Sequence, residues 1–253
     1  MNTDILLVGL VVALASSLFG VLVILRRLAL VSDALTHVAL PGLAIAIWLS
    51  WPPFIGAFLF LLLAVFFVHT VQKKFDFGTE TLVGVLFTVA LAIGILITPQ
   101  ESLIEALFGD ISKISRFDFV MALIGGGAVI TGTLFYWRDF LKALISPELA
   151  IGEQINIKKT DLVFLIFLAL SVAIGVKAIG TLLMGALIML PAATAKNITG
   201  NLRQMVFVSV GIGAASMAGG LWISAWSHWP PGPTVVLLGS LLFCASLLIP
   251  SRR

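Results

Sequence analysis

The sequence predicts an all-α fold, a polytopic membrane bundle of eight or nine transmembrane helices. Hydrophobic residues make up 60% of the 253 residues and charged residues only 11%, against about 45–50% apolar and about 25% charged in an average soluble domain. The apolar runs are long and lack the alternation of outer-membrane strands, so we expect helices to span the bilayer. This composition excludes disorder and a disulfide scaffold. The single cysteine, Cys244, is expected to be a small buried hydrophobe.

Nine segments have about the length that a helix needs to cross the hydrocarbon layer, roughly 20 residues. They are Ile5–Leu25, Leu28–Leu49, Pro53–Val71, Thr79–Thr98, Phe119–Trp137, Leu162–Val176, Ala178–Ala195, Met205–Trp226 and Thr234–Ile249. The sixth and ninth are short, and only Lys177 separates the sixth from the seventh. Eight spans plus a broken or re-entrant segment therefore remain an alternative. We expect one transmembrane domain over residues 1–253.

The basic residues predict the orientation of the chain. With the N-terminus outside, all of the 15 Lys and Arg residues except Lys113, Arg116 and Lys177 fall in inner loops or at the C-terminus. Basic residues gather on the cytoplasmic side of a membrane, so we expect the N-terminus outside and the C-terminus in the cytoplasm. The first run precedes its basic pair instead of following it, which argues against a cleavable signal peptide. The net charge of +3 is therefore a topology signal and does not indicate nucleic-acid binding.

Two connections are long: Pro99–Asp118, expected outside, and Arg138–Asp161, expected inside. In the inner one, Ser146-Pro147-Glu148 is typical of a helix start, because Ser can cap, Pro suits the first turn and Glu is favoured by the helix dipole. We expect a short amphipathic helix there, which either docks a cytoplasmic partner or closes the loop. The chain has no phosphate-binding loop, so uphill transport would draw its energy from a partner chain or an ion gradient.

The second predicted span contains an acid and an imidazole, Asp33 and His37. A charge inside a span costs about 2.5–3.5 kcal/mol, and such residues usually face a cavity or a partner. Because they are four positions apart, the two side chains share one helix face, with a rise of about 6 Å between them. Together they form half of a divalent-metal site, which a symmetric second copy would complete.

Two simpler interpretations of this pair remain open. Asp33 and His37 could satisfy each other through a hydrogen bond, or Asp33 could pair with Arg27 near the inner boundary. Pro41-Gly42 follows one turn after His37 and can kink the helix. A kink there suits a gate, although membrane helices often contain both residues without gating.

Small residues in the seventh span, such as Gly185, permit close contact between helices. Met184 and Met189 could be soft metal ligands, but methionine more often fills gaps in a core. We take Pro41, Gly42, Gly185 and Pro191 as candidate gate or packing residues.

The segment Arg27–Gly42 resembles the signature of permeases from zinc and manganese uptake ABC transporters, of the ZnuB, MntB and TroC types. That signature is a basic stretch followed by Asp-Ala-x-x-His-x-x-Leu-Pro-Gly. Three further blocks, Leu107–Ile111, Gly180–Ala195 and Pro231–Val236, resemble the same family in the same order. The resemblance spans nearly the whole chain.

The resemblance implies a permease that pairs as a homodimer with two cytoplasmic ATP-binding subunits and accepts a divalent ion from an extracytoplasmic binding protein. It implies that Asp33 and His37 line the ion path. It also places Ser146, Pro147, Glu148 and Gly152 in the segment that contacts the ATPase. The Leu40-Pro41-Gly42 ending resembles the manganese or iron branch more than the zinc branch. The chain itself then needs no cofactor, because the metal is cargo and ATP binds to the partner subunit.

We therefore expect a transport protein, and not an enzyme, in a bacterial-type cytoplasmic membrane. The ion would enter near the loops of Asp110 and His228 and pass Asp33 and His37. Carboxylate oxygens suit manganese, imidazole suits zinc, iron and manganese alike, and the lack of a thiolate disfavours copper(I). The alternative is the permease of a metal-chelate or siderophore importer, with a wider path and no paired ligands. A remoter one is an intramembrane metalloenzyme, which would need three fixed ligands and a base within one chain.

Overall fold

The computed structural model describes residues 3–75, 77–99, 106–109, 115–145, 148 and 152–248, and over these residues its regular structure is helical. The long helices are α1 (Thr3–Leu25), α4 (Pro53–Lys74), α5 (Thr79–Ile97), α7 (Arg116–Phe135), α10 (Ile157–Ile179), α11 (Thr181–Ile198), α12 (Leu202–Ser227) and α13 (Pro231–Leu247). The shorter ones are α2 (Ala29–Val38), α3 (Leu40–Trp48) and α8 (Trp137–Ile145). The predicted all-α class is confirmed.

Among the described residues, seven helical segments are long and apolar enough to cross a membrane, with α2 and α3 counted together as Ala29–Trp48. Leu183–Ile198 and Pro231–Leu247 are shorter apolar helices. Each of the nine segments expected from the sequence therefore coincides with helix.

The boundary between the sixth and seventh segments differs from the prediction. The sequence predicts a short sixth span that stops before Lys177, whereas α10 runs from Ile157 to Ile179 and includes that lysine. The chain breaks at Gly180, whose φ of 91° is a left-handed conformation that glycine adopts without strain. The break therefore lies at Gly180, three residues beyond Lys177.

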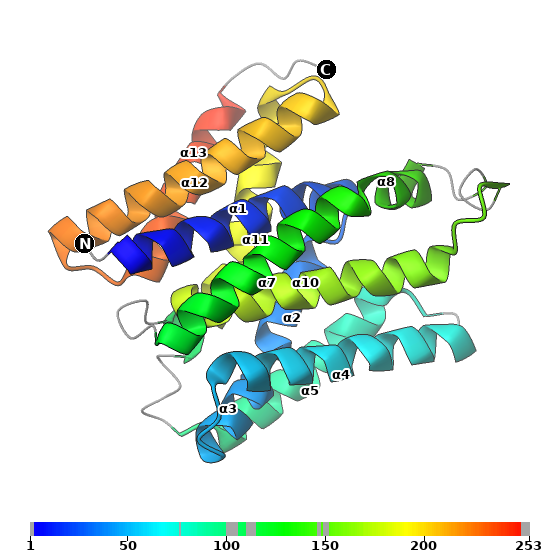
Figure 1. Cartoon of the computed structure of the whole chain (residues 1–253), viewed down its shortest axis with the longest axis horizontal. Helices are drawn as coiled ribbons and strands as arrows, with labels where there is room; N and C mark the ends of the chain where they lie inside the picture. Colours follow the sequence, from blue (N-terminus) through cyan, green and yellow to red (C-terminus); the bar gives the residue numbers. More distant parts are fainter. Residues whose placement is uncertain are drawn as a thin grey trace.

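Helix α1 forms the centre of the bundle. It packs against α7, α10, α11 and α12, and its side chains Val12, Phe19 and Leu22 are fully buried. Helix α2 lies between α5 and α11, while α3 packs against α4 and α5. In Figure 1, α12 and α1 lie in the upper part of the bundle, α7 crosses its middle, and α4 and α5 form the lower edge.

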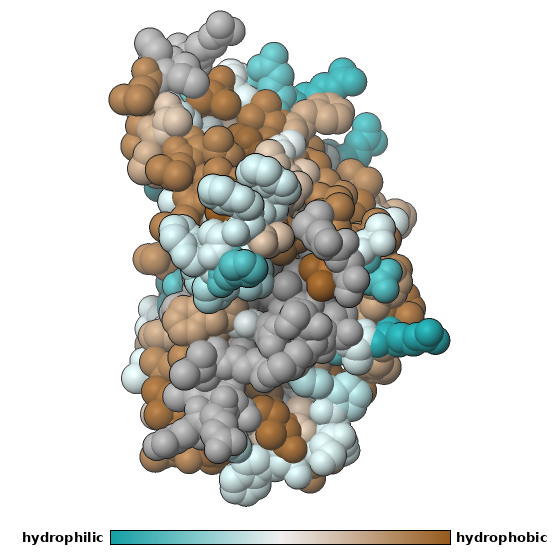
Figure 2. All heavy atoms as spheres, turned by 90° about the vertical axis from the view of Figure 1, so that its left-hand side faces the viewer, coloured by the Kyte–Doolittle hydropathy of each residue, from teal (hydrophilic) through white to brown (hydrophobic). Residues whose placement is uncertain are grey.

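Basic residues gather at one end of the bundle. Helices α1, α4 and α7 end on the right of Figure 1, where α10 and α12 begin, so the basic residues next to these ends gather on one side. Figure 2 faces the opposite end, where pale and teal residues lie between brown, apolar flanks. This sidedness is what the predicted orientation requires.

Many large apolar side chains remain exposed, among them Leu96 at 84% and Leu63 at 67%. A bilayer is the environment in which such surfaces are stable. Cys244 is also exposed on α13, which corrects the expectation that it is buried: it lies on the outer face of an apolar helix instead of in the core.

Candidate metal centre and coupling segment

Asp33 and His37 lie on α2, a short helix of 10 residues between two breaks. It follows Arg27, which has a left-handed φ of 60°, and Ala39 separates it from α3. Pro41 lacks the amide hydrogen that a continuous helix would direct at the carbonyl of His37. The break therefore falls where the sequence predicts a kink, and it leaves His37 in the last turn of α2.

Asp33 packs against Gly185 of α11. A Cβ atom at position 185 would overlap the carboxylate oxygen Oδ1 of Asp33 and lie 2.9 Å from its Cα. The absence of a side chain at Gly185 thus creates the space that the carboxylate occupies. Gly185 is a predicted packing residue, and its contact with the acid is a finding of the structure.

The carboxylate of Asp33 has no ion pair or hydrogen bond among the described residues. The hydroxyl of Thr36 donates to the backbone carbonyl of Asp33 at 2.6 Å, and not to its side chain. At the start of this segment Arg26 forms an ion pair with Asp161. Neither an Asp33–His37 hydrogen bond nor an Asp33–Arg27 ion pair forms among the described residues.

His37 lies half-buried against α5, with its ring centroid 5.3 Å from that of Phe87 in an edge arrangement. Its Nδ1 atom is buried and has no hydrogen-bond partner in the described part of the chain. Buried polar atoms are nearly always paired, and an imidazole nitrogen without a partner is a candidate metal ligand. The two members of the pair thus contact different helices, α11 and α5.

Within the described ranges, no cluster of three or more His, Cys, Asp or Glu side chains could hold a metal ion. Asp33 and His37 offer one oxygen-type and one nitrogen-type ligand, which fits a divalent ion but leaves its coordination incomplete. The donor set is therefore half a site.

The Leu40–Gly42 motif forms a tightly packed joint. A Cβ atom on Gly42 would overlap the backbone carbonyl oxygen of Gly56 on α4, and one on Gly94 of α5 would lie 2.8 Å from the Cβ of Leu40. Pro41 and Gly42 are buried. Gly56 and Gly94 are contact residues that the sequence analysis missed, although small residues in apolar helices are a known sign of close packing.

Pro191 lies apart from the metal pair. It is inside α11, which continues to Ile198, and it faces Ser216 of α12 and Val235 of α13. Of the two candidate residues on this helix, the structure therefore brings only Gly185 to Asp33.

The blocks on the predicted outer side meet at two glycines. Gly109 and Gly180 have φ values of 71° and 91°, and a Cβ atom on Gly180 would lie 2.5 Å from the amide nitrogen of Gly109. Asp110 lies outside the described residues. His228 is exposed and ends α12 in a left-handed conformation.

A short amphipathic helix begins the inner connection, ahead of the helix start predicted at Ser146. It is α8, which ends at Ile145, and it buries Phe140 completely. Ser146 and Pro147 lie outside the described residues. Glu148 and Gly152 are exposed, and the adjacent Glu153 forms an ion pair with Lys142 of α8.

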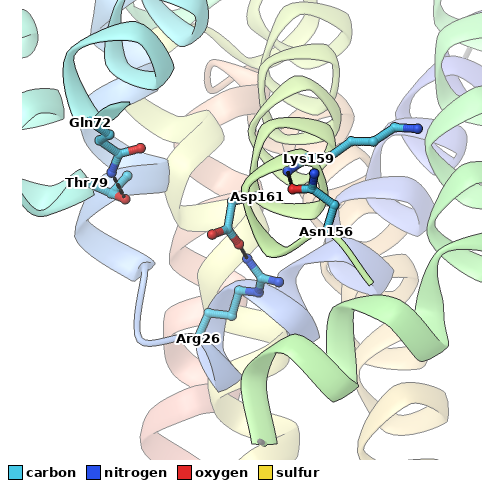
Figure 3. Close-up of polar contacts among 6 residues, drawn as sticks. All are labelled: Arg26, Gln72, Thr79, Asn156, Lys159 and Asp161. Atoms are coloured by element: carbon cyan, nitrogen blue, oxygen red, sulfur yellow. Dashed lines mark hydrogen bonds and ion pairs between the residues drawn. The ribbon is translucent and has the colours of Figure 1, made fainter. Parts of the chain in front are cut away.

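Arg26 lies between this inner segment and α2, the helix that carries Asp33 and His37. Figure 3 shows its guanidinium directed at Asp161 of α10, with Nη1 at 2.7 Å from Oδ1. The same group lies 4.3 Å from the ring centroid of Phe164 and 5.6 Å from that of Phe140 on α8. Because the Arg26 side chain is only 10% exposed, it forms a buried junction between the end of α1, α8 and α10. Sequence analysis counted Arg26 only as a topology signal.

The fold and the site together define a multi-pass membrane permease. Residues 2–250 match the ABC 3 transport family, and the chain belongs to that family. The predicted family resemblance is therefore confirmed.

Three similar proteins illustrate the match. The "High-affinity zinc uptake system membrane protein ZnuB" of Haemophilus influenzae is 33% identical over 247 residues, which cover 96% of this chain and 95% of that protein. The "Manganese transport system membrane protein MntC" of Listeria monocytogenes is 27% identical over 252 residues, covering 98% and 90%. The structure of "PsaBC from Streptococcus pneumoniae in complex with Fab" matches with a TM-score of 0.86 and 27% identity, over 98% of this chain and 91% of that one. These are transport proteins, which agrees with the prediction that the chain is not an enzyme.

Proposed function

We propose that this chain is the permease subunit of an ABC importer for divalent metal ions, manganese, zinc or iron. The observation that carries the proposal is the Asp33–His37 pair, which lies inside a span and has no partner among the described residues. Charged and polar groups in a membrane are expensive unless they serve a pathway. The similarity to zinc and manganese permeases over nearly the whole chain supports the same conclusion.

A homodimer would complete the site. Two copies related by a two-fold axis contribute the same residues, so two Asp33 and two His37 side chains supply four ligands. Helix α5 carries the His37 neighbour Phe87 and exposes Val85, Val89 and Leu96. We infer that the second copy approaches along this face of α5.

The ion passes from the outer side to the cytoplasm through this site. A transport site must release its ion, so two ligands from each chain suit it better than a closed cage. Proton-free imidazole and carboxylate ligands fit manganese, zinc and iron. The metal-binding protein outside delivers the ion, and the cytoplasmic ATPase drives the change between outward- and inward-facing states.

The inner connection provides the contact to the ATPase. Helix α8 is held on the bundle through Phe140, and it leads directly to Ser146, Pro147, Glu148 and Gly152. Because Arg26 contacts α8 and precedes α2, a displacement of the inner segment would reach the helix that carries the metal pair.

The isosteric substitutions Asp33→Asn and His37→Gln test the function. The first removes the negative charge of the carboxylate and the second the imidazole nitrogen, with little change in volume, so we expect uptake of Mn²⁺ and Zn²⁺ to fall at least about tenfold, the loss that 1.4 kcal/mol represents. Cellular metal is measured by elemental mass spectrometry, with permease levels checked in isolated membranes. Leu30→Ala, on the same helix but 80% exposed, is the control. Normal uptake by both isosteric variants would exclude the pair from the ion path.

A further inference from the structure

A groove opens on the surface of the bundle between α7 and α12. Both helices pack on α1, and the groove lies at the end where α7 terminates and α12 begins (Figure 1). It has a volume of about 610 Å³, within the range of roughly 300–1,000 Å³ that is usual for small-molecule sites. We call it the α7–α12 groove and define it by Leu18, Phe135, Arg138, Arg203, Val206 and Phe207.

The walls of the groove are apolar and open. Leu18 of α1 forms part of the lining and is only 6% exposed, whereas Phe135 and Phe207 on the two flanking helices are 81% and 68% exposed. These residues belong to helices long and apolar enough to cross the membrane. A hydrocarbon chain is the occupant that such walls fit at this depth.

Two arginines contribute to the lining of the same groove. Arg138 lies in the first turn of α8 and Arg203 in the first turn of α12, so both belong to the basic end of the bundle. Both are exposed, and neither forms an ion pair with another described residue. Guanidinium groups bind phosphate oxygens in a bidentate manner, so the charge of the groove complements a phosphate group.

We propose that the α7–α12 groove binds an anionic phospholipid of the cytoplasmic leaflet. Its phosphate lies between Arg138 and Arg203, and an acyl chain follows Phe135, Phe207 and Leu18. The proposal rests on the predicted membrane orientation, but not on the metal that is transported. Since α7 continues into α8, the bound lipid would join the inner connection to α12.

A second copy of the chain fits this groove less well. A two-fold axis along the membrane normal places equal heights of the two copies together. An interface through the groove would therefore bring two Arg138 and two Arg203 side chains to one level. Like charges at an interface are unfavourable, whereas a lipid phosphate would neutralise them.

Native mass spectrometry of the purified permease–ATPase complex tests the proposal. The complex is titrated with phosphatidylglycerol and, separately, with phosphatidylcholine. We expect phosphatidylglycerol to bind preferentially. Each basic residue near an anionic lipid contributes about a fivefold gain in affinity, so R138Q/R203Q should weaken phosphatidylglycerol binding about 25-fold. R138K/R203K, which keeps the charge, should retain most of it.

A matched control removes the same charge outside the groove. Lys158 and Lys159 lie at the same end of the bundle and are exposed, and Figure 3 shows the ammonium group of Lys159 directed away from the neighbouring polar cluster. K158Q/K159Q should leave phosphatidylglycerol binding within about twofold of wild type, and V206W, which fills the groove, should abolish the preference.

Three results would overturn the proposal. These are equal binding of the two lipids, an equal loss in the K158Q/K159Q control, and retention of binding in R138Q/R203Q. A further result would also overturn it, by showing that a second copy of the chain occupies the groove. That result is efficient disulfide crosslinking of F207C between two permease chains in a C244S background.

Discussion

At the residue scale, the carboxylate of Asp33 occupies space that is open because its neighbour, Gly185, has no side chain. Gly185 leaves room for the carboxylate, and any Cβ atom there would overlap it. His37 has a different neighbour, Phe87, and a buried Nδ1 atom with no hydrogen-bond partner in the described chain. A pair held between α11 and α5 in this way responds to movement of either helix.

Gly185→Ala should therefore impair transport without preventing insertion. Filling a packed contact typically costs about 1–3 kcal/mol, and here the displaced atoms belong to a proposed ligand. We expect metal uptake to fall about tenfold while the permease remains in the membrane, measured by elemental mass spectrometry and immunoblotting. Gly211→Ala, where an added Cβ atom meets nothing within 4 Å, should leave uptake unchanged. If G185A transports like G211A, the Gly185 contact does not position Asp33.

The sequence alone suggests Asp33 and His37 as a pair of candidate ligands, but it does not predict their surroundings. Spacing shows that Asp33 and His37 share a helix face, because that follows from helix geometry. It does not show that Gly185, more than 150 positions away, is the neighbour of Asp33, because contacts between helices depend on their packing. Pro191 illustrates the same limit, since it lies on α11 with Gly185 but faces α12 and α13.

At the element scale, the buried Arg26 junction attaches the amphipathic helix α8 to the bundle. One guanidinium nitrogen bonds to Asp161, and the plane of the group lies near Phe164 and Phe140. Arg26 thus stabilises the inner connection through both charge and ring contacts, for which a planar guanidinium is better suited than an ammonium group.

Arg26→Ala should loosen α8. Asp161 is 48% exposed and can be hydrated after the loss, so the cost should be below the 3–5 kcal/mol of a fully buried pair, at about 2–3 kcal/mol. We expect a lower thermal midpoint of the purified complex and faster hydrogen exchange in residues 137–145. Lys142→Ala removes an exposed ion pair and should cost under about 1 kcal/mol. If R26A and K142A lower the thermal midpoint and speed hydrogen exchange equally, the Arg26 junction does not hold α8 on the bundle.

The elements themselves could largely be predicted from the sequence. Long apolar runs determine α1, α4, α5 and α12 because only a helix satisfies the backbone in lipid. Helix α8 was not predicted as a separate helix, because the fifth span was expected to end at Trp137 and the helix of the inner connection to start at Ser146, which lies outside the described residues. The break at Gly180 was also missed, because a left-handed residue is a property of the folded backbone.

At the scale of the whole molecule, the helix ends divide the structure into a basic side and an opposite side. Helices α1, α4 and α7 end together in Figure 1, which agrees with the distribution of Lys and Arg in the sequence. By the positive-inside tendency we predict that the basic side faces the cytoplasm. The single-domain organisation over residues 1–253 stays a prediction.

Cysteine labelling tests this orientation. In a C244S background, Trp229→Cys and Lys158→Cys place one thiol on each side, and both parent residues are exposed. An impermeant maleimide applied to intact spheroplasts should label W229C at once and K158C only after permeabilisation. The reverse pattern would place the N-terminus in the cytoplasm.

The stoichiometry of bound metal tests the central claim most directly. The purified, nucleotide-free permease–ATPase complex is equilibrated with Mn²⁺ or Zn²⁺, separated from free ion and measured by elemental mass spectrometry. If two copies share one site built from Asp33 and His37, we expect about one ion for each pair of permease chains, and almost none in D33N or H37Q complexes that assemble normally. One ion for each chain, or undiminished metal in both variants, would contradict the account.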